Sequence, residues 1–166
     1  MLFKPKQRLS VIANQCTPPI AQGIRSLAAD GKKQFPQSQP TEESLITSHL
    51  VTLMVLLHST SDQGINHKLY RFTNESVLDF FVSDDAFSWG SYEELQAQVF
   101  EVFKQIASQS ADRIYQSLAV WALGQRKAHP FDAMALQTNL TQVLIYNKRL
   151  MDDMLKQHKV VDDVEF

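Results

Sequence analysis

Residues 41–60 read TEESLITSHLVTLMVLLHST, and this stretch decides the fold. Between Leu50 and Leu57 seven of eight residues are apolar, so a helix here has no face suited to water and is expected to be buried among other helices. Thr41 is a suitable helix start, because its hydroxyl accepts a free backbone N–H and the two acids behind it favour the positive end of the helix dipole. The run is shorter than the roughly 20 apolar residues that span a membrane. We therefore predict a central, buried helix here.

The composition is that of an ordinary folded domain. The chain has 166 residues, 44% hydrophobic and 20% charged, and this length suits one domain. A net charge of −2 gives no overall attraction to nucleic acid or to an anionic membrane. Cys16 is the one cysteine, which excludes an internal disulfide and a cysteine-based zinc site. One thiol suits a reducing compartment, and the apolar residues 9–13 are too few for a signal-peptide core, so we expect a cytoplasmic protein without membrane insertion.

Helical spacing of apolar residues recurs along the chain, and glycine and proline are few. This pattern predicts an all-α fold: a single-domain helical bundle of about six helices with a long C-terminal helix. We divide the chain into an N-terminal helical arm over residues 1–31, a polar linker over 32–40 with Phe35 as its anchor, the bundle over 41–159, and a frayed acidic tail over 160–166.

The local signals set the expected helix limits. A first helix over residues 5–15 should stop at Pro18 and Pro19, with a restart over 20–29, because proline removes a backbone donor. Residues 65–73 are ambiguous, and a short helix through Phe81 is expected after the cap residue, either Thr73 or Asn74. Ser91 and Glu94 form a capping box, in which Glu94 is expected to reach back to the Ser91 amide. In the loop before it, Phe87 and Trp89 are expected to pack at the edge of the core.

The last helix should begin at Pro130 and meets no breaker until about residue 159, a length of about 45 Å. It carries an apolar stripe with spacings of four and three residues: Leu136, Leu140, Val143, Asn147, Leu150 and Met154. An asparagine on such a stripe specifies register and partner number in coiled coils. We interpret the chain as a non-enzymatic interaction or regulatory module that forms a homodimer or binds a protein partner through these six residues. For the stripe itself, packing within the chain is favoured over a partner surface, because five neighbours widen it: Leu144, Ile145, Tyr146, Met151 and Leu155. The length of the helix keeps the partner surface open.

A second class of function is a small helical metal-binding protein or enzyme that uses His49, His58, Asp84 or Asp85. The two histidines lie nine residues apart, which places them on opposite helix faces rather than at one metal. Residues 80–87 (FFVSDDAF) resemble the aspartate-rich magnesium segment of terpene synthases, but a third acid and a second metal motif are missing. We expect Asp84 and Asp85 to be capping or loop residues, and we expect no catalytic residues, metal or cofactor.

The third and weakest alternative is a nucleic-acid-binding regulator. A helix, a basic turn with Arg126 and Lys127, and a second helix are arranged as in a helix-turn-helix. Four polar side chains of the second helix suit the reading of base edges: Gln137, Thr138, Asn139 and Gln142. The connection is longer than the usual turn and the positive face is thin, so we expect no nucleic-acid partner.

Overall fold

Seven α-helices and one pair of short strands form the part of the chain that the computed structural model describes, residues 3–60 and 64–166. The prediction of an all-α fold is confirmed. The elements are β1 (Lys6–Arg8), α1 (Leu9–Ala29), α2 (Gly31–Gln34), α3 (Glu42–His58), α4 (Ile65–Val82), α5 (Tyr92–Ala107), α6 (Ala111–Ala122), the 3-10 helix η1 (Gln125–Lys127), α7 (Pro130–Gln157) and β2 (Lys159–Val161).

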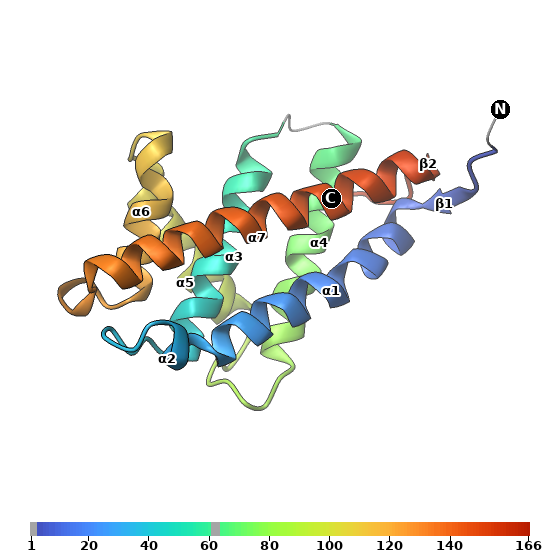
Figure 1. Ribbon diagram of the computed structural model, residues 1–166. Helices are drawn as coiled ribbons and strands as arrows, with labels where there is room; N and C mark the ends of the chain where they lie inside the picture. Colours follow the sequence, from blue (N-terminus) through green and yellow to red (C-terminus); the bar gives the residue numbers. More distant parts are fainter. Residues whose placement is uncertain (1–2, 61–63) are drawn as a thin grey trace.

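Helix α3 is the centre of the bundle, as residues 41–60 predict. It contacts α1, α4, α5, α6 and α7, and in Figure 1 α1 and α7 cross in front of it. The Thr41 hydroxyl accepts the backbone N–H of Ser44 at 3.1 Å, so the expected cap is present. Thr47, Ser48 and Thr52 are fully buried, but each hydroxyl donates to a carbonyl of the same helix. Burial therefore leaves these hydroxyls hydrogen-bonded.

Helix α1 is continuous through Pro18 and Pro19, so the predicted break is wrong. Both prolines are exposed, and the carbonyls that lose a donor belong to the exposed residues Asn14 and Gln15, where water can replace it. The opposite face of α1 is buried, mainly against α4: Leu9, Ile12, Ala13, Cys16, Ile20, Ala21, Ile24 and Ala28. Burial of each large aliphatic side chain stabilises the fold by roughly 1.5–3 kcal/mol. The sum over this face offsets the cost of about 3 kcal/mol for each proline inside a helix. The helix starts at Leu9 rather than at residue 5.

Helix α4 is one element, where the sequence predicts an ambiguous segment followed by a short helix. Its buried residues Leu69, Tyr70, Thr73 and Val77 continue one face through the expected start at Asn74, which is itself buried in the helix interior. Packing of this face against α1 and α3 overrides the local capping preference of asparagine.

The loop before α5 matches the sequence prediction in part. Trp89 is 9% exposed, its ring lies 5.3 Å from that of Phe87, and its Nε1 donates to Gln98, so the expected packing of the two aromatics is confirmed. The Ser91 hydroxyl accepts the N–H of Glu94, as a capping box requires. The Glu94 carboxylate, however, accepts the N–H of Gly90 at 2.8 Å instead of that of Ser91. Gly90 has no side chain to obstruct this approach: a Cβ there would lie 2.9 Å from Glu94 Oε2.

The linker and the tail are both tied to the helices. Phe35 is buried, as expected, and the N–H of Ser38 donates to Asp132 near the start of α7. Strand β2 pairs in parallel with β1, with Gln7 opposite Val160, and Val164 is buried. The expectation of a frayed tail is therefore wrong. The sequence did not predict that α1 packs on the bundle and that β1 and β2 lie side by side (Figure 1).

Candidate functional site

The predicted contact stripe of α7 faces largely into the chain's own core. Leu136, Leu140 and Asn147 are at most 2% exposed, and the other three members, Val143, Leu150 and Met154, are half-buried. Helix α7 packs on α6, α3, α1 and α4 through this side. The structure thus brings the six residues onto one face of α7. Three of them, Leu136, Leu140 and Asn147, are buried within the chain.

The outer face of α7 is the part that the sequence prediction missed. Phe131 is 74% exposed, Met134 65%, Tyr146 60% and Ile145 51%, although all four are large and apolar. Phe131, Met134 and Ile145 lie on the side of the helix opposite Leu136 and Leu140, whereas Tyr146 lies on the flank that faces α1. Ile145 and Tyr146 are expected from the sequence to widen the buried stripe, and this expectation is wrong because both are exposed. At about 100° per residue, Ile145 falls opposite Leu136 and Leu140, which was the available signal. Exposed apolar residues that gather on one element are typical of interaction surfaces.

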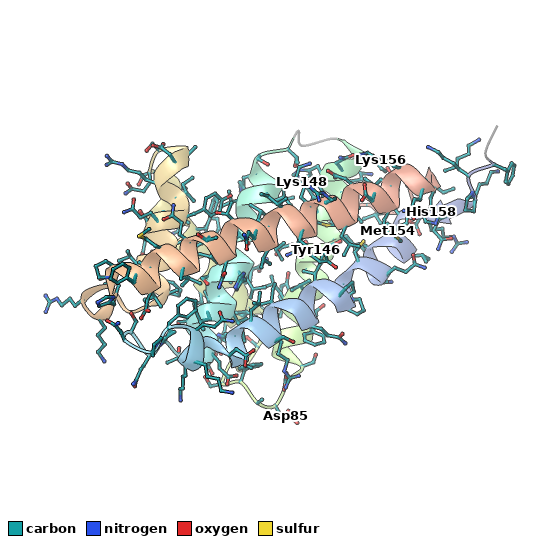
Figure 2. The ribbon with its side chains drawn as sticks, in the orientation of Figure 1. Asp85, Tyr146, Lys148, Met154, Lys156 and His158 are labelled. Carbon is teal, nitrogen blue, oxygen red and sulfur yellow. The ribbon has the colours of Figure 1, made fainter. Side chains whose placement is uncertain are left out.

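A groove of about 280 Å³ lies between α1 and α7. Its lining is contributed by both helices: Pro19, Ile20, Gly23 and Leu27 from α1, and Gln142, Val143, Tyr146 and Asn147 from α7. None of these residues is charged. In Figure 2 Tyr146 lies on the side of α7 that is turned toward α1. We call this surface the α1–α7 groove.

Two features of the groove have no explanation within the chain. The Nδ2 of Asn147 is buried and has no hydrogen-bond partner among the described residues, an arrangement that costs about 1–3 kcal/mol. Gly23 lies in the interior of α1, where glycine is unfavourable relative to alanine. A Cβ at Gly23 would meet no atom within 4 Å, so packing within the described chain does not require the glycine.

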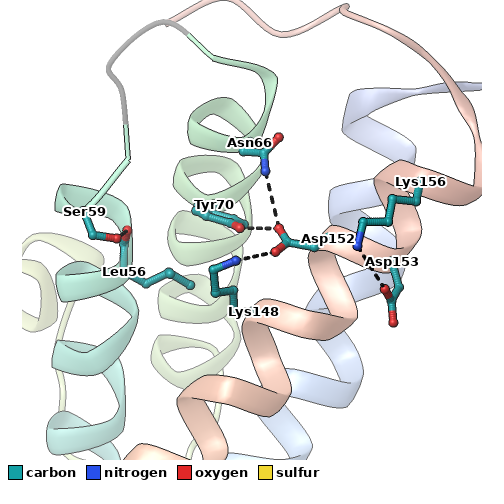
Figure 3. Close-up of polar contacts among 8 residues, drawn as sticks. All are labelled: Leu56, Ser59, Asn66, Tyr70, Lys148, Asp152, Asp153 and Lys156. Carbon is teal, nitrogen blue, oxygen red and sulfur yellow. Dashed lines mark hydrogen bonds and ion pairs between the residues drawn. The ribbon is translucent and has the colours of Figure 1, made fainter.

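Asp152 is the centre of a polar cluster between α7 and α4 (Figure 3). Its carboxylate accepts the Tyr70 hydroxyl, Lys148 Nζ at 2.5 Å and Asn66 Nδ2 at 3.4 Å. Burial, and then the Asp152 carboxylate, raise the pKa of Tyr70. An aspartate in this part of α7 reads from the sequence as a solvated surface residue, which is wrong for Asp152 because α4 supplies partners that the sequence of α7 does not reveal. Asp153, by contrast, is exposed and 4.0 Å from Lys156. The cluster joins two helices and presents no free group.

The histidines of α3 are separate. His49 is 2% exposed, and burial lowers its pKa to about 4. His58 is hydrogen-bonded to the Met54 carbonyl and lies 4.6 Å from the ring of Phe103. Asp84 forms an ion pair with Arg25 at 2.6 Å and accepts the N–H of Ala86, which is a loop role. Within residues 3–60 and 64–166 no three histidine, cysteine or acidic side chains are placed to share a metal ion.

Several polar side chains proposed to read nucleic acid are used within the fold. The Thr138 hydroxyl donates to the Met134 carbonyl, and Asn139 donates to Gln34. Gln142 lines the α1–α7 groove. Two of the four proposed side chains, Thr138 and Asn139, are therefore already hydrogen-bonded within the described chain.

No known protein family, curated protein sequence or solved structure matched the chain. Among the helices of the described residues, none combines the length and the apolar character needed to cross a membrane.

Proposed function

We propose that this protein is a non-enzymatic helical interaction module that forms a homodimer through the α1–α7 groove. The observation that carries the proposal is the unpartnered amide of Asn147 at an uncharged groove that is also lined by the exposed Tyr146. Cores of protein interfaces are likewise depleted of charge and enriched in aromatic residues.

A second copy of the chain is the occupant that the groove fits best. A two-fold interface uses the same patch on both subunits, so the patch must carry both a projection and a hollow. One stretch of α7 has both, since Tyr146 projects beside the hollow that Val143 and Asn147 line. A volume of about 280 Å³ suits an inserted side chain rather than a drug-sized ligand, for which sites of about 300–1,000 Å³ are usual.

Tyrosine also has the chemistry that the hollow needs. Its ring is apolar, as is most of the lining, and its hydroxyl oxygen can accept a hydrogen bond from Asn147 Nδ2. In the dimer each Tyr146 inserts into the groove of the other copy, and each buried amide gains a partner. This assignment replaces the buried residues Leu136 and Leu140 with Tyr146 as the contact residue of α7. The proposal keeps the cytoplasmic location that a single, buried thiol favours.

The test is the mass of the pure chain by sedimentation velocity over a range of concentrations. Gly23→Trp should fill the groove and give a monomer, because a side chain at this position points into open space. Gln22→Trp is the matched control: Gln22 is the exposed neighbour and does not line the groove, so this variant should remain a dimer. A monomer for the unchanged chain at about 1 mM, where even a weak dimer of millimolar Kd is populated, contradicts the proposal.

A further inference from the structure

We propose that a second hollow, formed by α6, η1 and the loop between α5 and α6, binds a small organic anion that carries a flat polar ring, a mononucleotide being the type of ligand. The hollow has a volume of about 770 Å³, within the range usual for small-molecule sites. It is independent of the α1–α7 groove, with which it shares no residue. Its lining is Gln109, Arg113, Gln116, Ser117, Val120, Trp121, Gln125 and Arg126.

The charge of the lining indicates an anion. Arg113 and Arg126 both line the hollow, no carboxylate lines it, and neither arginine forms an ion pair with any described residue. Two positive charges that share a concave surface repel each other unless an anion lies between them. A guanidinium group offers a planar pair of donors that matches phosphate and carboxylate oxygens. In a chain with a net charge of −2, this pair is a local positive site.

The local geometry explains how these side chains come together. Arg113, Ser117 and Val120 recur every three or four residues, so they share one face of α6, while Leu118, Ala119 and Ala122 are buried on another. After α6, Gly124 and Gln125 both have positive φ, 86° and 50°. This left-handed turn leads the chain into η1, which supplies Gln125 and Arg126 to the hollow.

Gln125 is strained in this turn, and the strain coincides with the site. A non-glycine residue in the left-handed region costs about 1–2 kcal/mol relative to a right-handed conformation. Such residues cluster at ligand sites. Gly124 N–H donates to the Trp121 carbonyl, and Ala128 N–H donates to the Gln125 carbonyl, so backbone hydrogen bonds hold the strained turn in place.

The uncharged side chains of the lining favour a flat polar ring. Trp121 is half-buried and lines the hollow, and an indole face binds a base by stacking with about 1–3 kcal/mol. Gln109, Gln116 and Gln125 each offer a carbonyl acceptor and an amide donor, which suit the polar edge of a heterocycle. The two arginines are the only cations that line the hollow among the described residues. This is too short a positive track for a nucleic-acid strand but enough for one phosphate.

The test is a titration of the full chain with adenosine monophosphate, in which binding is measured by calorimetry and by tryptophan fluorescence. Trp89 is buried and is replaced by phenylalanine for the fluorescence work, so that the signal comes from Trp121. We expect saturable quenching, and calorimetry on the unchanged chain gives the same Kd without the substitution. Adenosine and inorganic phosphate should each bind at least about tenfold more weakly than the nucleotide, because each makes half of the contacts.

Arg113→Ala and Arg126→Ala should each weaken binding at least about tenfold, the usual loss when a charge-assisted contact to an anion is removed. Lys127→Ala is the matched control: Lys127 is the exposed neighbour of Arg126 and does not line the hollow, so its Kd should change by less than about twofold. Thermal unfolding of each variant confirms that it is folded. The proposal is overturned by no binding to the unchanged chain up to about 10 mM nucleotide, by an equal loss in Lys127→Ala, or by tighter binding of a single-stranded oligonucleotide than of the mononucleotide.

Discussion

The carboxylate of Asp163 accepts two hydrogen bonds from Ser10, one from the backbone N–H at 3.0 Å and one from the hydroxyl at 2.6 Å, although the residues are 153 positions apart. Helix α1 has no side-chain cap of its own at Arg8. Asp163 therefore caps α1 from the other end of the chain, and its negative charge lies at the positive end of the helix dipole. The tail is also held by Lys68, which pairs with Asp162 at 2.7 Å and donates to the Val164 carbonyl.

Asp163→Ala should loosen the tail and the start of α1 together. We expect amide exchange in the first turn of α1 and in β2 to become at least about tenfold faster, because local opening governs exchange there. Asp153→Ala is the control, since Asp153 is exposed and its ion pair with Lys156, at 4.0 Å, is long. In the unchanged chain, the hydrogen bonds from Ser10 lower the pKa of Asp163. The stabilisation that Asp163 gives to the tail and to α1 should therefore be present above the ordinary aspartate pKa and be lost as the pH falls through the lowered value. Unchanged exchange in Asp163→Ala would show that the contact does not hold the tail.

Tyr70→Phe should destabilise the protein by about 1–2 kcal/mol, because Asp152 loses its hydroxyl donor while Lys148 remains. Urea unfolding gives the free energy directly. Tyr115→Phe is the matched control: Tyr115 is half-buried, and its hydroxyl has no hydrogen bond to any described residue. It should change stability by less than about 0.5 kcal/mol. Equal effects in the two variants would contradict a specific role for the Asp152 cluster.

The unfolding free energy should fall as the pH is lowered from about 6.5 to about 4, because of His49. Burial lowers the pKa of His49 to about 4, whereas the unfolded chain binds the proton at the ordinary value of 6.5. Between these values the unfolded state holds more protons, so acid favours it, by up to about 3 kcal/mol. His49→Leu should remove this slope, and His67→Leu, at a half-buried position, should keep it. An NMR titration that finds His49 protonated near pH 6.5 in the folded chain would contradict the prediction.

Asn147→Leu should stabilise the isolated subunit by about 1–2 kcal/mol, because it removes a buried donor without a partner. If the proposed dimer forms, the same change should also alter its dissociation constant, since the Tyr146 hydroxyl loses its donor. Thermal unfolding at low concentration measures the first effect, and sedimentation measures the second. Asn139→Leu is the control, because Asn139 already donates to Gln34 and its loss should not stabilise the fold.

The two glycines Gly23 and Gly31 should respond oppositely to alanine. Gly23→Ala should stabilise α1 by about 0.5–1 kcal/mol, since the new Cβ meets nothing within 4 Å. Gly31→Ala should destabilise the fold by about 1–3 kcal/mol, because its Cβ would lie 2.1 Å from Cδ1 of the buried Leu45. Chemical unfolding of both variants tests the pair, and a gain in stability for Gly31→Ala would mean that Leu45 can move aside.

The features that could be predicted from the sequence are those that depend only on residues close together in the chain. The burial of α3 follows from its own apolar run, and the caps at Thr41 and Ser91 join residues three positions apart. The all-α class follows from the same local spacing. The apolar stripe of α7 was visible for this reason too, but its spacing alone does not say whether Asn147 faces another copy or the chain's own core.

The remaining features depend on contacts between distant residues. Pro18 and Pro19 stay within α1 because its far face is buried on α4, and the tail is ordered because Asp163 meets Ser10. Arg113 and Arg126 share one hollow only because a left-handed turn at Gly124 places η1 beside α6. Local propensity is worth less than the burial of a helix face, so where such contacts form, the tertiary structure decides the outcome.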